Sequence, residues 1–369
     1  MNAFSILFTD TFNNENVGEL TNIRSVASIP FGGRYRLIDF MLSSLVNANV
    51  RNIGVIMKNK YNSLADHLGT GKDWDLNRKN GGIKLLLPYA QSQTGEFRSR
   101  IEALCGIDSF IYHMLPEYCI ITEGNMVCNI DFSDVLRFHA AQGADMTVLY
   151  KETESAADDD TEITLDQNGR IIDALYHSGN SEKKCNVIMR VYVLSKVLLK
   201  HIIDQGATFG WKDINRDYIA PSLKTANIIG YKHNGYCKVI RNVSDYYSAN
   251  MDLLKFEVRN DLFNGEHKIY TKVKDSVPAK YGDSAKVMNS LVADGCKIDG
   301  TVENCILFRD VVIKKDALVH NSIIMQGTVV EENAQVSGII ADKDVTITRS
   351  RALVGSPSLP VVIAKDLKV

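Results

Sequence analysis

An aliphatic residue returns at every sixth position in the last quarter of the chain. The residues that follow this step are Ile306, Val312, Leu318, Ile324, Val330 and Val336, and Val292 and Ile298 show it before a two-residue slip. This period predicts a parallel β-helix, in which each hexapeptide supplies one side of a coil and turns its aliphatic residue inward. Irregular antiparallel strands are the alternative, but their period would be two. Because a solenoid has open ends and exposed ladder edges, we expect other subunits to cover them.

The first two thirds of the chain alternate strand and helix patterns. An apolar strand at Phe4 to Phe8 is followed by helical spacing over Leu37 to Val46 and a second strand at Ile53 to Met57. This order is typical of an α/β fold, with a mostly parallel sheet, helices on both faces and ligands beyond the carboxyl ends of the strands. After Leu254 the long helical patterns disappear, and short aliphatic, Gly, Asn and Asp motifs take their place. We therefore predict a first domain over 1–254, a linker over 255–285 and the β-helix over 286–369.

Charge and apolar content exclude several classes of function. The 42 basic and 44 acidic residues give a net charge of −2 without a basic stripe, so a nucleic-acid partner is not expected. No run approaches the roughly 20 apolar residues of a membrane span, and we expect a cytoplasmic protein without membrane contact. The seven cysteines are scattered without a C-x-x-C pair, which indicates reduced, mostly buried thiols rather than a metal cluster.

One long motif resembles a known enzyme family. The segment PFGGRYRLIDFMLSSLVNANVRNIGVI, from Pro30 to Ile56, is similar to the one that follows the nucleotide loop in glucose-1-phosphate adenylyltransferases (ADP-glucose pyrophosphorylases). Further matches occur in the family's order at Gly71–Arg78, Gly81–Gly82, Leu87–Tyr89, Gly95–Glu96, Pro116–Tyr118, Ala249–Leu254 and Asn289–Glu303. The resemblance implies a Rossmann-like nucleotidyltransferase domain followed by a left-handed β-helix.

The phosphate-binding positions that the resemblance assigns have lost their chemistry. The family's G-G-x-G-x-R-L loop wraps the triphosphate, and glycine allows the close backbone approach that this needs. The corresponding residues here are Thr11, Phe12, Asn14 and Asn16, and Val26 stands where the family has a lysine. A loop that binds phosphate in another way is the alternative.

The positions that would hold Mg²⁺ and the sugar phosphate have changed as well. Asn125 replaces the family's first metal-binding aspartate and Val239 the second, while His177 stands at the lysine of its Glu-Lys-Pro motif. An amide cannot offset the charge of the cation as a carboxylate does. We therefore expect neither catalytic residues nor a cofactor, although catalytic relatives use Mg²⁺.

These losses predict a catalytically deficient regulatory subunit of the family, of the type called GlgD. The resemblance implies a heterotetramer with a catalytic, GlgC-type homologue, or else a homo-oligomer, that makes ADP-glucose from ATP and glucose 1-phosphate for glycogen. Arg24, Arg34 and Arg36 flank the conserved-looking turn and suit a phosphorylated effector, although a solvated basic surface is the alternative.

Two other functions stay open on the sequence. One is an active sugar-phosphate nucleotidyltransferase with a remodelled site, which the lost carboxylates oppose. The other is a β-helix sugar acyltransferase, whose catalytic histidine could only be His320. We assign His113, His139 and Asp131 to packing or to the surface, since no pattern ties them together.

Overall fold

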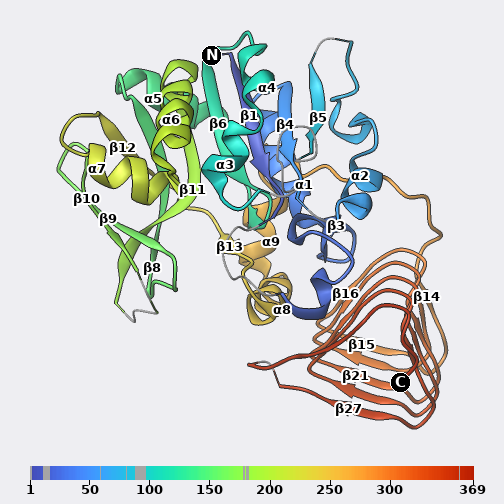
Figure 1. Cartoon of the computed structure of the whole chain (residues 1–369). Coiled ribbons are helices and arrows are strands. Elements are labelled where there is room, and N and C mark those ends of the chain that lie inside the picture. Colours follow the sequence, from blue (N-terminus) through green and yellow to red (C-terminus); the bar gives the residue numbers. More distant parts are fainter. Residues whose placement is uncertain are drawn as a thin grey trace.

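A computed structural model of the chain describes residues 2–10, 17–58, 60–79, 81–87, 97–177, 179, 183–356 and 358–369. It shows an α/β domain and, packed beneath it in Figure 1, a C-terminal β-helix of stacked triangular coils. The predicted fold class is thus confirmed.

The first domain is built on a nine-stranded sheet. Its main path runs β10-β9-β11-β6-β1-β4-β5, while β8 pairs with β11 and β12. The strands β6, β1, β4 and β5 are parallel, and β11 joins them antiparallel to β6. The bounds are β1 (Ala3–Phe8), β4 (Asn52–Ile56), β5 (Gly82–Leu86), β6 (Tyr118–Glu123), β8 (Met146–Thr153), β9 (Thr161–Leu165), β10 (Ile171–Tyr176), β11 (Cys185–Ser195) and β12 (Ile228–Lys232).

Helices cover both faces of this sheet because each carries an apolar stripe. One core contains buried residues of α1 (Leu37–Asn47), α2 (Asn62–Leu68) and α5 (Phe132–Ala141). The core on the other face contains residues of α3 (Arg100–Cys105), α4 (Asp108–Tyr112) and α6 (Lys196–Phe209). The short α7 (Ala220–Ser222) lies near β10. None of the helices in the described ranges combines the length and the apolar content of a membrane span.

The β-helix consists of three parallel five-stranded sheets, one for each side of the coil. The first contains β14 (Lys280–Tyr281), β17 (Lys297–Ile298), β20 (Val312–Ile313), β23 (Val329–Val330) and β26 (Thr346–Ile347). The second contains β15 (Lys286–Met288), β18 (Thr301–Glu303), β21 (Leu318–His320), β24 (Gln335–Ser337) and β27 (Ala352–Val354). The third contains β16 (Leu291–Val292), β19 (Ile306–Leu307), β22 (Ile323–Ile324), β25 (Ile339–Ala341) and β28 (Val361–Ile363).

The six-residue register drawn from the sequence is only partly right. Ile313 pairs with Val330, and Val330 with Ile347, so these later coils have 17 residues and one of their three sides is a residue short. As a result Val319 is fully buried whereas Leu318, which the hexad count turns inward, is 37% exposed. Ile313 rather than Val312 is likewise the buried member of its strand.

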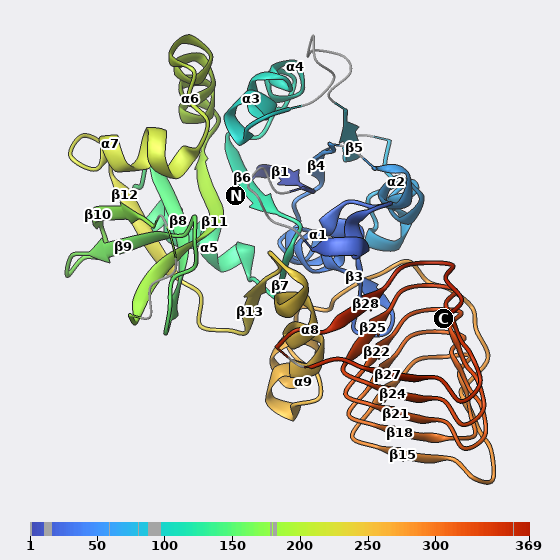
Figure 2. The same cartoon turned by 60° about the horizontal axis from the view of Figure 1, so that its bottom comes forward.

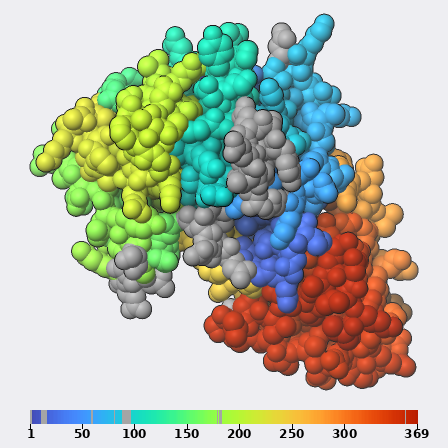
Figure 3. Space-filling model, in the orientation of Figure 1, coloured from blue at the N-terminus to red at the C-terminus, as the bar shows by residue number. Residues whose placement is uncertain are grey.

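The two domains share a hydrophobic core. Phe31, Phe40 and Tyr246 of the first domain belong to one buried cluster with Ile306 and Ile323 of the β-helix. Helices α8 (Val243–Asp252) and α9 (Phe256–Phe263) lie beside the β-helix in Figure 2. Figure 3 shows blue atoms of the first domain directly against the red atoms of the β-helix.

The linker expected over 255–285 is shorter than predicted. Helix α9 and strand β14 both fall within that stretch, and the first β-helix ladder already pairs Lys280 with Lys297. The helix packs through Leu262, which is fully buried in the shared core. The change in sequence texture after Leu254 therefore precedes the change in fold, because α9 completes the first domain.

Candidate functional site

The nucleotide-binding crevice of such a sheet is fixed by its strand order. From β1 the chain builds β4 and β5 on one side, whereas β6 pairs with the other side of β1. Ligands of open α/β sheets bind outside the carboxyl ends of the strands where this reversal occurs. Here that edge is formed by Phe8, which pairs with Glu123, and by Asp10 just after β1. Thr11, Phe12, Asn14 and Asn16, at the positions of the family's glycine-rich loop, lie outside the described residues.

A buried ion pair lies at this edge of the sheet. Arg100, the first residue of α3, donates its Nε to Glu123 Oε1 at 2.6 Å, and the two side chains are only 5% and 7% exposed. The pair continues into a network in which Asp213 lies 3.6 Å from Arg100 and 3.4 Å from Arg190. Neither Arg100 nor Glu123 was singled out from the sequence, because their partnership joins a helix start to a strand end 23 residues away.

A second carboxylate lies at the end of β1. Burial raises the pKa of Asp10 to about 6, although the backbone N–H of Val26 and the charge of Lys58 favour its ionised form. Val26 itself is 5% exposed and belongs to the apolar core shared by the two domains. Where catalytic relatives are expected to receive a triphosphate, this chain presents a neutralised ion pair, the Asp10 carboxyl group and an aliphatic side chain. The ionised form of Asp10 disfavours a phosphate there.

The two degenerate metal positions lie on one β-ribbon. Strand β7 (Met126–Cys128) pairs antiparallel with β13 (Cys237–Val239), with Val239 opposite Met126, so Asn125 is one step from Val239 across the ribbon. The Asn125 side chain is 2% exposed and its Nδ2 donates to the Ile240 carbonyl at 3.3 Å. Its Oδ1 is buried without a hydrogen-bond partner.

These residues do not fit the Mg²⁺ of the catalytic relatives. One neutral amide oxygen and a valine supply no negative charge, whereas Mg²⁺ demands carboxylate and phosphate oxygens. In the part of the chain that the structure describes, no group of three or more His, Cys, Asp and Glu side chains could hold a metal ion. No catalytic step is therefore derived through this metal.

His177, at the position of the family's sugar-phosphate lysine, contacts another side chain of the same domain. His177 follows β10, and its Nε2 lies 3.0 Å from Glu162 Oε2, with the histidine side chain 12% exposed. The neighbouring cleft, of about 430 Å³, is lined by Lys151, Asp160, Val239 and Arg241 among others. Arg241 pairs with Asp160, and Lys151 donates to the Cys237 carbonyl at 2.5 Å.

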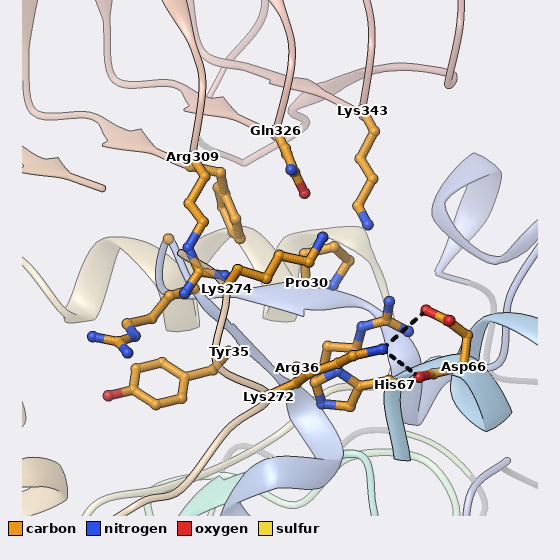
Figure 4. Close-up of a pocket in the computed structure, with 13 residues that line it drawn as sticks. Pro30, Tyr35, Arg36, Asp66, His67, Lys272, Lys274, Arg309, Gln326 and Lys343 are labelled. Atoms are coloured by element: carbon orange, nitrogen blue, oxygen red, sulfur yellow. Dashed lines mark hydrogen bonds and ion pairs between the residues drawn. The ribbon is translucent and has the colours of Figure 1, made fainter. Parts of the chain in front are cut away.

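A different pocket gathers positive charge where the two domains meet. It has a volume of about 60 Å³, room for about two water molecules or one small anion. It is lined by one carboxylate, Asp66, and by six cationic side chains, those of Arg34, Arg36, Lys272, Lys274, Arg309 and Lys343. Figure 4 labels all of these residues except Arg34. Arg309 and Lys343 come from the β-helix, Lys272 and Lys274 from the connecting segment, and the other two arginines from the turn in the first domain.

A tight hairpin presents the two arginines of the first domain. Strands β2 (Pro30–Phe31) and β3 (Tyr35–Arg36) are joined through Gly32 and Gly33, both with positive φ. A Cβ on Gly32 would lie 2.8 Å from the Leu253 side chain, so glycine is required there by both conformation and space. Arg36 then caps α1, where its N–H donates to Asp39 at 2.9 Å and its Nη1 to the Ser63 carbonyl at 2.6 Å.

Several pocket cations are held in unfavourable surroundings. The Arg309 side chain is 6% exposed and its Nε is buried without a hydrogen-bond partner. Burial lowers the pKa of Arg309, and the charge of Arg34 adds to that effect. Burial, with the charges of Arg36, Arg24 and Lys274, lowers the pKa of Lys343 to about 8. An anion would relieve this mutual repulsion, so the pocket is suited to a phosphate or sulfate group.

The three arginines named from the sequence therefore separate. Arg34 and Arg36 line the pocket, but Arg24 does not: it forms a bidentate pair with Asp342, with both distances 2.9 Å and both side chains at most 3% exposed. The placement of Arg24 in an effector site is thus corrected, since its guanidinium is already bound. Lys272, Lys274, Arg309 and Lys343 could not be found from the sequence, because they are distant in the chain and carry no motif.

The histidines and aspartate assigned to packing or surface have local partners. His139 is 2% exposed and its Nδ1 lies 2.8 Å from Thr147 Oγ1, while His113 lies 2.7 Å from the Ser109 carbonyl. Asp131 caps α5 by accepting from the Ser133 and Asp134 N–H groups. His320 lies on β21 with its Nδ1 3.3 Å from Glu303. All seven cysteines are free thiols, six of them buried.

Comparisons with known proteins agree with the two-domain architecture. Residues 17–173 match a nucleotidyl transferase family, and residues 275–357 match a GlmU-like C-terminal hexapeptide family. The chain is 37% identical over 359 residues to the glycogen biosynthesis protein GlgD of Bacillus subtilis, covering 97% of this chain and 94% of that protein. It is also 31% identical to the glucose-1-phosphate adenylyltransferase of Thermosipho africanus, over 82% of this chain and 74% of that enzyme.

Proposed function

The chain belongs to the family of GlgD and glucose-1-phosphate adenylyltransferase, which supports a role in glycogen biosynthesis, and we propose that it is a catalytically deficient regulatory subunit of that adenylyltransferase. Its task is to modulate the synthesis of ADP-glucose from ATP and glucose 1-phosphate by a catalytic homologue. One observation carries the proposal: Asn125 and Val239 occupy the two positions where catalytic relatives are expected to hold Mg²⁺.

The magnitude of the loss supports negligible turnover by this chain alone. Removing a single preorganised electrostatic contact typically slows catalysis by about 10²- to 10³-fold, and a metal ion stabilises transition-state charge by several kcal/mol. Such effects are not additive within one site, so the factors cannot be multiplied. Even the loss of the metal alone would leave phosphoryl transfer without its main charge stabilisation.

The crevice between β1 and β6 supports the same proposal from a second side. The Arg100–Glu123 pair fills the edge at which the nucleotide of a catalytic relative is expected, and Asp10 adds a further carboxylate. A nucleotide triphosphate at this edge would meet a buried ion pair whose charges already neutralise each other. Removal of one partner from such a pair is strongly unfavourable.

The regulatory part of the proposal rests on the interdomain pocket. A phosphorylated metabolite that bridges Arg36 of the first domain and Arg309 of the β-helix would favour one relative arrangement of the domains. A ligand can shift such an equilibrium only by its difference in affinity between states, which is typically worth 1–3 kcal/mol. In a mixed tetramer, a change in the domain arrangement would be transmitted to the catalytic subunit through the subunit contacts of the β-helix, including those at its open ends.

The decisive experiment compares ADP-glucose formation in three samples at equal total subunit concentration. They contain this chain alone, the catalytic homologue alone, and both together, with and without candidate phosphorylated effectors. We expect no turnover from this chain alone and an altered maximal rate or effector response in the mixture. Mass measurement of the mixture in solution reports whether a heterotetramer forms.

Two outcomes would contradict the proposal. Turnover of about 1 s⁻¹ or more by this chain alone would identify an active enzyme with a remodelled site. A mixed complex with the kinetics of the catalytic homologue would leave an assembly role without regulation. The control for a pocket variant such as Arg309→Met is Arg349→Met. It changes an exposed arginine of the β-helix that is paired with Glu332 and lies outside the pocket.

A further inference from the structure

Two cysteines face each other on the ribbon that carries the degenerate metal positions. Cys128 ends β7, Cys237 begins β13, and they are direct partners in the antiparallel register. They are 109 positions apart in the chain, so only the fold brings them together. Neither has any part in the proposed regulatory function.

The pairing type at this position favours a bond between the two sulfurs. The Ile240 N–H donates to the Asn125 carbonyl at 2.8 Å, which makes that couple a hydrogen-bonded pair. Hydrogen-bonded and non-hydrogen-bonded pairs alternate along an antiparallel ladder, so Cys237 and Cys128, three positions further, form a non-hydrogen-bonded pair. Such pairs have Cα atoms about 4.5 Å apart and the closer side chains. That separation falls within the range of disulfides, so a bond needs no large backbone movement.

The surroundings distinguish the two thiols. Interaction between the two sulfurs lowers the pKa of Cys237 and raises that of Cys128. The charges of Lys151 and Arg241 lower the pKa of Cys237 further, against the effect of burial. By contrast, burial raises the pKa of the other five cysteines, Cys105, Cys119, Cys185, Cys296 and Cys305. Reactive cysteines are those with stabilised thiolates.

Access comes through the cleft of about 430 Å³ beside the ribbon. Cys237 and Val239 both line this cleft, whereas Cys128 lies behind with no exposed surface. Cys237 is 4% exposed and lines the cleft, so a small oxidant in the cleft reaches this residue before Cys128. Charged side chains that line the same space are Lys151, Lys238 and Arg241, with Asp160 and Asp245.

We propose that Cys128 and Cys237 are a reversible oxidation site that closes to an intramolecular disulfide across β7 and β13. With hydrogen peroxide as oxidant, the Cys237 thiolate attacks one oxygen, an S–O bond forms, the O–O bond breaks, and the leaving hydroxide takes a proton to become water. The Cys128 sulfur then attacks the resulting sulfenic acid, the S–O bond breaks, and the Cys128 proton leaves with the hydroxide as a second water. Two thiols are oxidised and one peroxide is reduced to two waters; a dithiol reverses the reaction.

The bond would act on the element that joins the cleft to the domain interface. Strand β13 leads through Asn242 into α8, whose Asn250 Oδ1 accepts the Gly32 N–H at 3.0 Å. The Tyr247 hydroxyl of α8 donates to the Asn321 carbonyl of the β-helix at 2.6 Å. A covalent link at the start of β13 would therefore restrict the strand that leads into α8, the helix that contacts both the arginine-bearing hairpin and the β-helix.

The test treats the reduced full chain with a small excess of hydrogen peroxide and then labels all remaining thiols with N-ethylmaleimide after denaturation. We expect five labelled cysteines in place of seven, a linked peptide pair containing Cys128 and Cys237, and full labelling after dithiothreitol. Cys128→Ser should leave a sulfenic acid on Cys237 that dimedone captures. Cys237→Ser should leave every remaining thiol free.

The matched control is Cys105→Ser, because Cys105 is the one cysteine with substantial exposure. If exposure alone governed oxidation, Cys105 would react first and its replacement would change the pattern. The proposal requires the Cys105→Ser chain to form the same disulfide as the wild type. Seven labelled thiols after peroxide treatment, a linkage between other cysteines, or earlier modification of Cys105 in the wild-type chain would each overturn it. These results depend only on the wild-type chain and the control, so they hold even if a ribbon variant fails to fold.

Discussion

The crevice between β1 and β6 and the pocket between the domains use charged residues in opposite ways. In the crevice, Arg100 is neutralised by Glu123, and Asp10 adds negative charge. In the pocket, six cations face one carboxylate, and Arg309 lacks a hydrogen-bond partner at its Nε. The charges of the crevice therefore disfavour a phosphate, whereas the cations of the pocket repel one another until an anion binds there.

Under the proposed function, this difference separates the chemistry of the fold from its recognition of ligands. The crevice is lined by neighbouring strands of a single domain, so substitutions there can change its charge without disturbing the sheet. The pocket instead depends on three separate segments held together by the shared core of the two domains. Its cations lie together only when the two domains are in this arrangement, so an anion bound there would favour this arrangement. The proposed regulatory function needs this property.

The largest effect should come from breaking the buried pair between Arg24 and Asp342. We expect Asp342→Ala to lower the free energy of unfolding by about 3–5 kcal/mol, because Arg24 would remain buried and unpaired near Arg36 and Lys343. Urea unfolding followed by circular dichroism measures this change. The double variant Arg24→Met with Asp342→Leu should recover most of the loss. A single variant as stable as the wild type would show that the pair does not join the domains.

Arg309→Met should weaken sulfate binding by about tenfold or more. A hydrogen bond from a charged donor is worth about 1.5–3 kcal/mol, and Arg309 is one of the six cations that line the pocket. Isothermal titration calorimetry at constant ionic strength measures the affinity, and Arg349→Met serves as the exposed control. Equal losses in the two variants would mean that the anion responds to overall charge and not to this pocket.

Asp10→Asn should stabilise the chain by about 1–2 kcal/mol at pH 7.5. The folded pKa of about 6 exceeds the ordinary value of 3.8, so the unfolded state ionises first and the folded state is destabilised as pH rises between these values. The gain should therefore be full above pH 6 and vanish near pH 4. Unfolding curves at pH 4 and pH 7.5 distinguish this from a pH-independent packing effect, which would contradict the burial of a charged carboxylate.

The affinity for sulfate should fall several-fold as the pH rises from 7 to 9. Lys343 loses its proton near pH 8 in the folded chain, below its ordinary pKa of 10.5, and only its charged form attracts the anion. The free energy of unfolding should change in the opposite direction. Between about pH 8 and 10.5 the unfolded chain binds more protons than the folded chain, so the destabilisation caused by this group decreases as the pH rises. Calorimetry with Lys343→Met should show weaker binding at pH 7 and little change over this range. If the affinity of Lys343→Met for sulfate falls with pH as it does in the wild type, another group is responsible for the titration.

The smallest effect is expected from restoring the two metal-binding carboxylates. Asn125→Asp combined with Val239→Asp should leave ADP-glucose formation undetectable with Mg²⁺, ATP and glucose 1-phosphate, because Arg100 and Glu123 still fill the crevice. Adding Arg100→Ala and Glu123→Ala to these changes tests whether the crevice can then bind nucleotide. Turnover near 1 s⁻¹ by the first double variant would show that the ion pair is no obstacle.

The sequence by itself determined the two-domain fold and the residues that stand at the positions to which the family resemblance assigns catalysis. Periodic aliphatic residues specify a β-helix because each must face inward, and alternating strand and helix patterns specify the layered sheet. Asn125 and Val239 were identifiable because a motif supplies the expected residue at each position. Local patterns of this kind are written in consecutive residues and need no knowledge of distant contacts.

Only the tertiary structure decided which charges meet. Arg24 and Arg36 look equivalent in the chain, yet Asp342, 318 positions away, binds the first and leaves the second in the pocket. The shortened coils that turn Val319 inward in place of Leu318 were likewise decided by stacking, since each strand must pair with the next coil. Pairwise Coulomb and packing energies depend on separation in space, and separation along the chain does not reveal it.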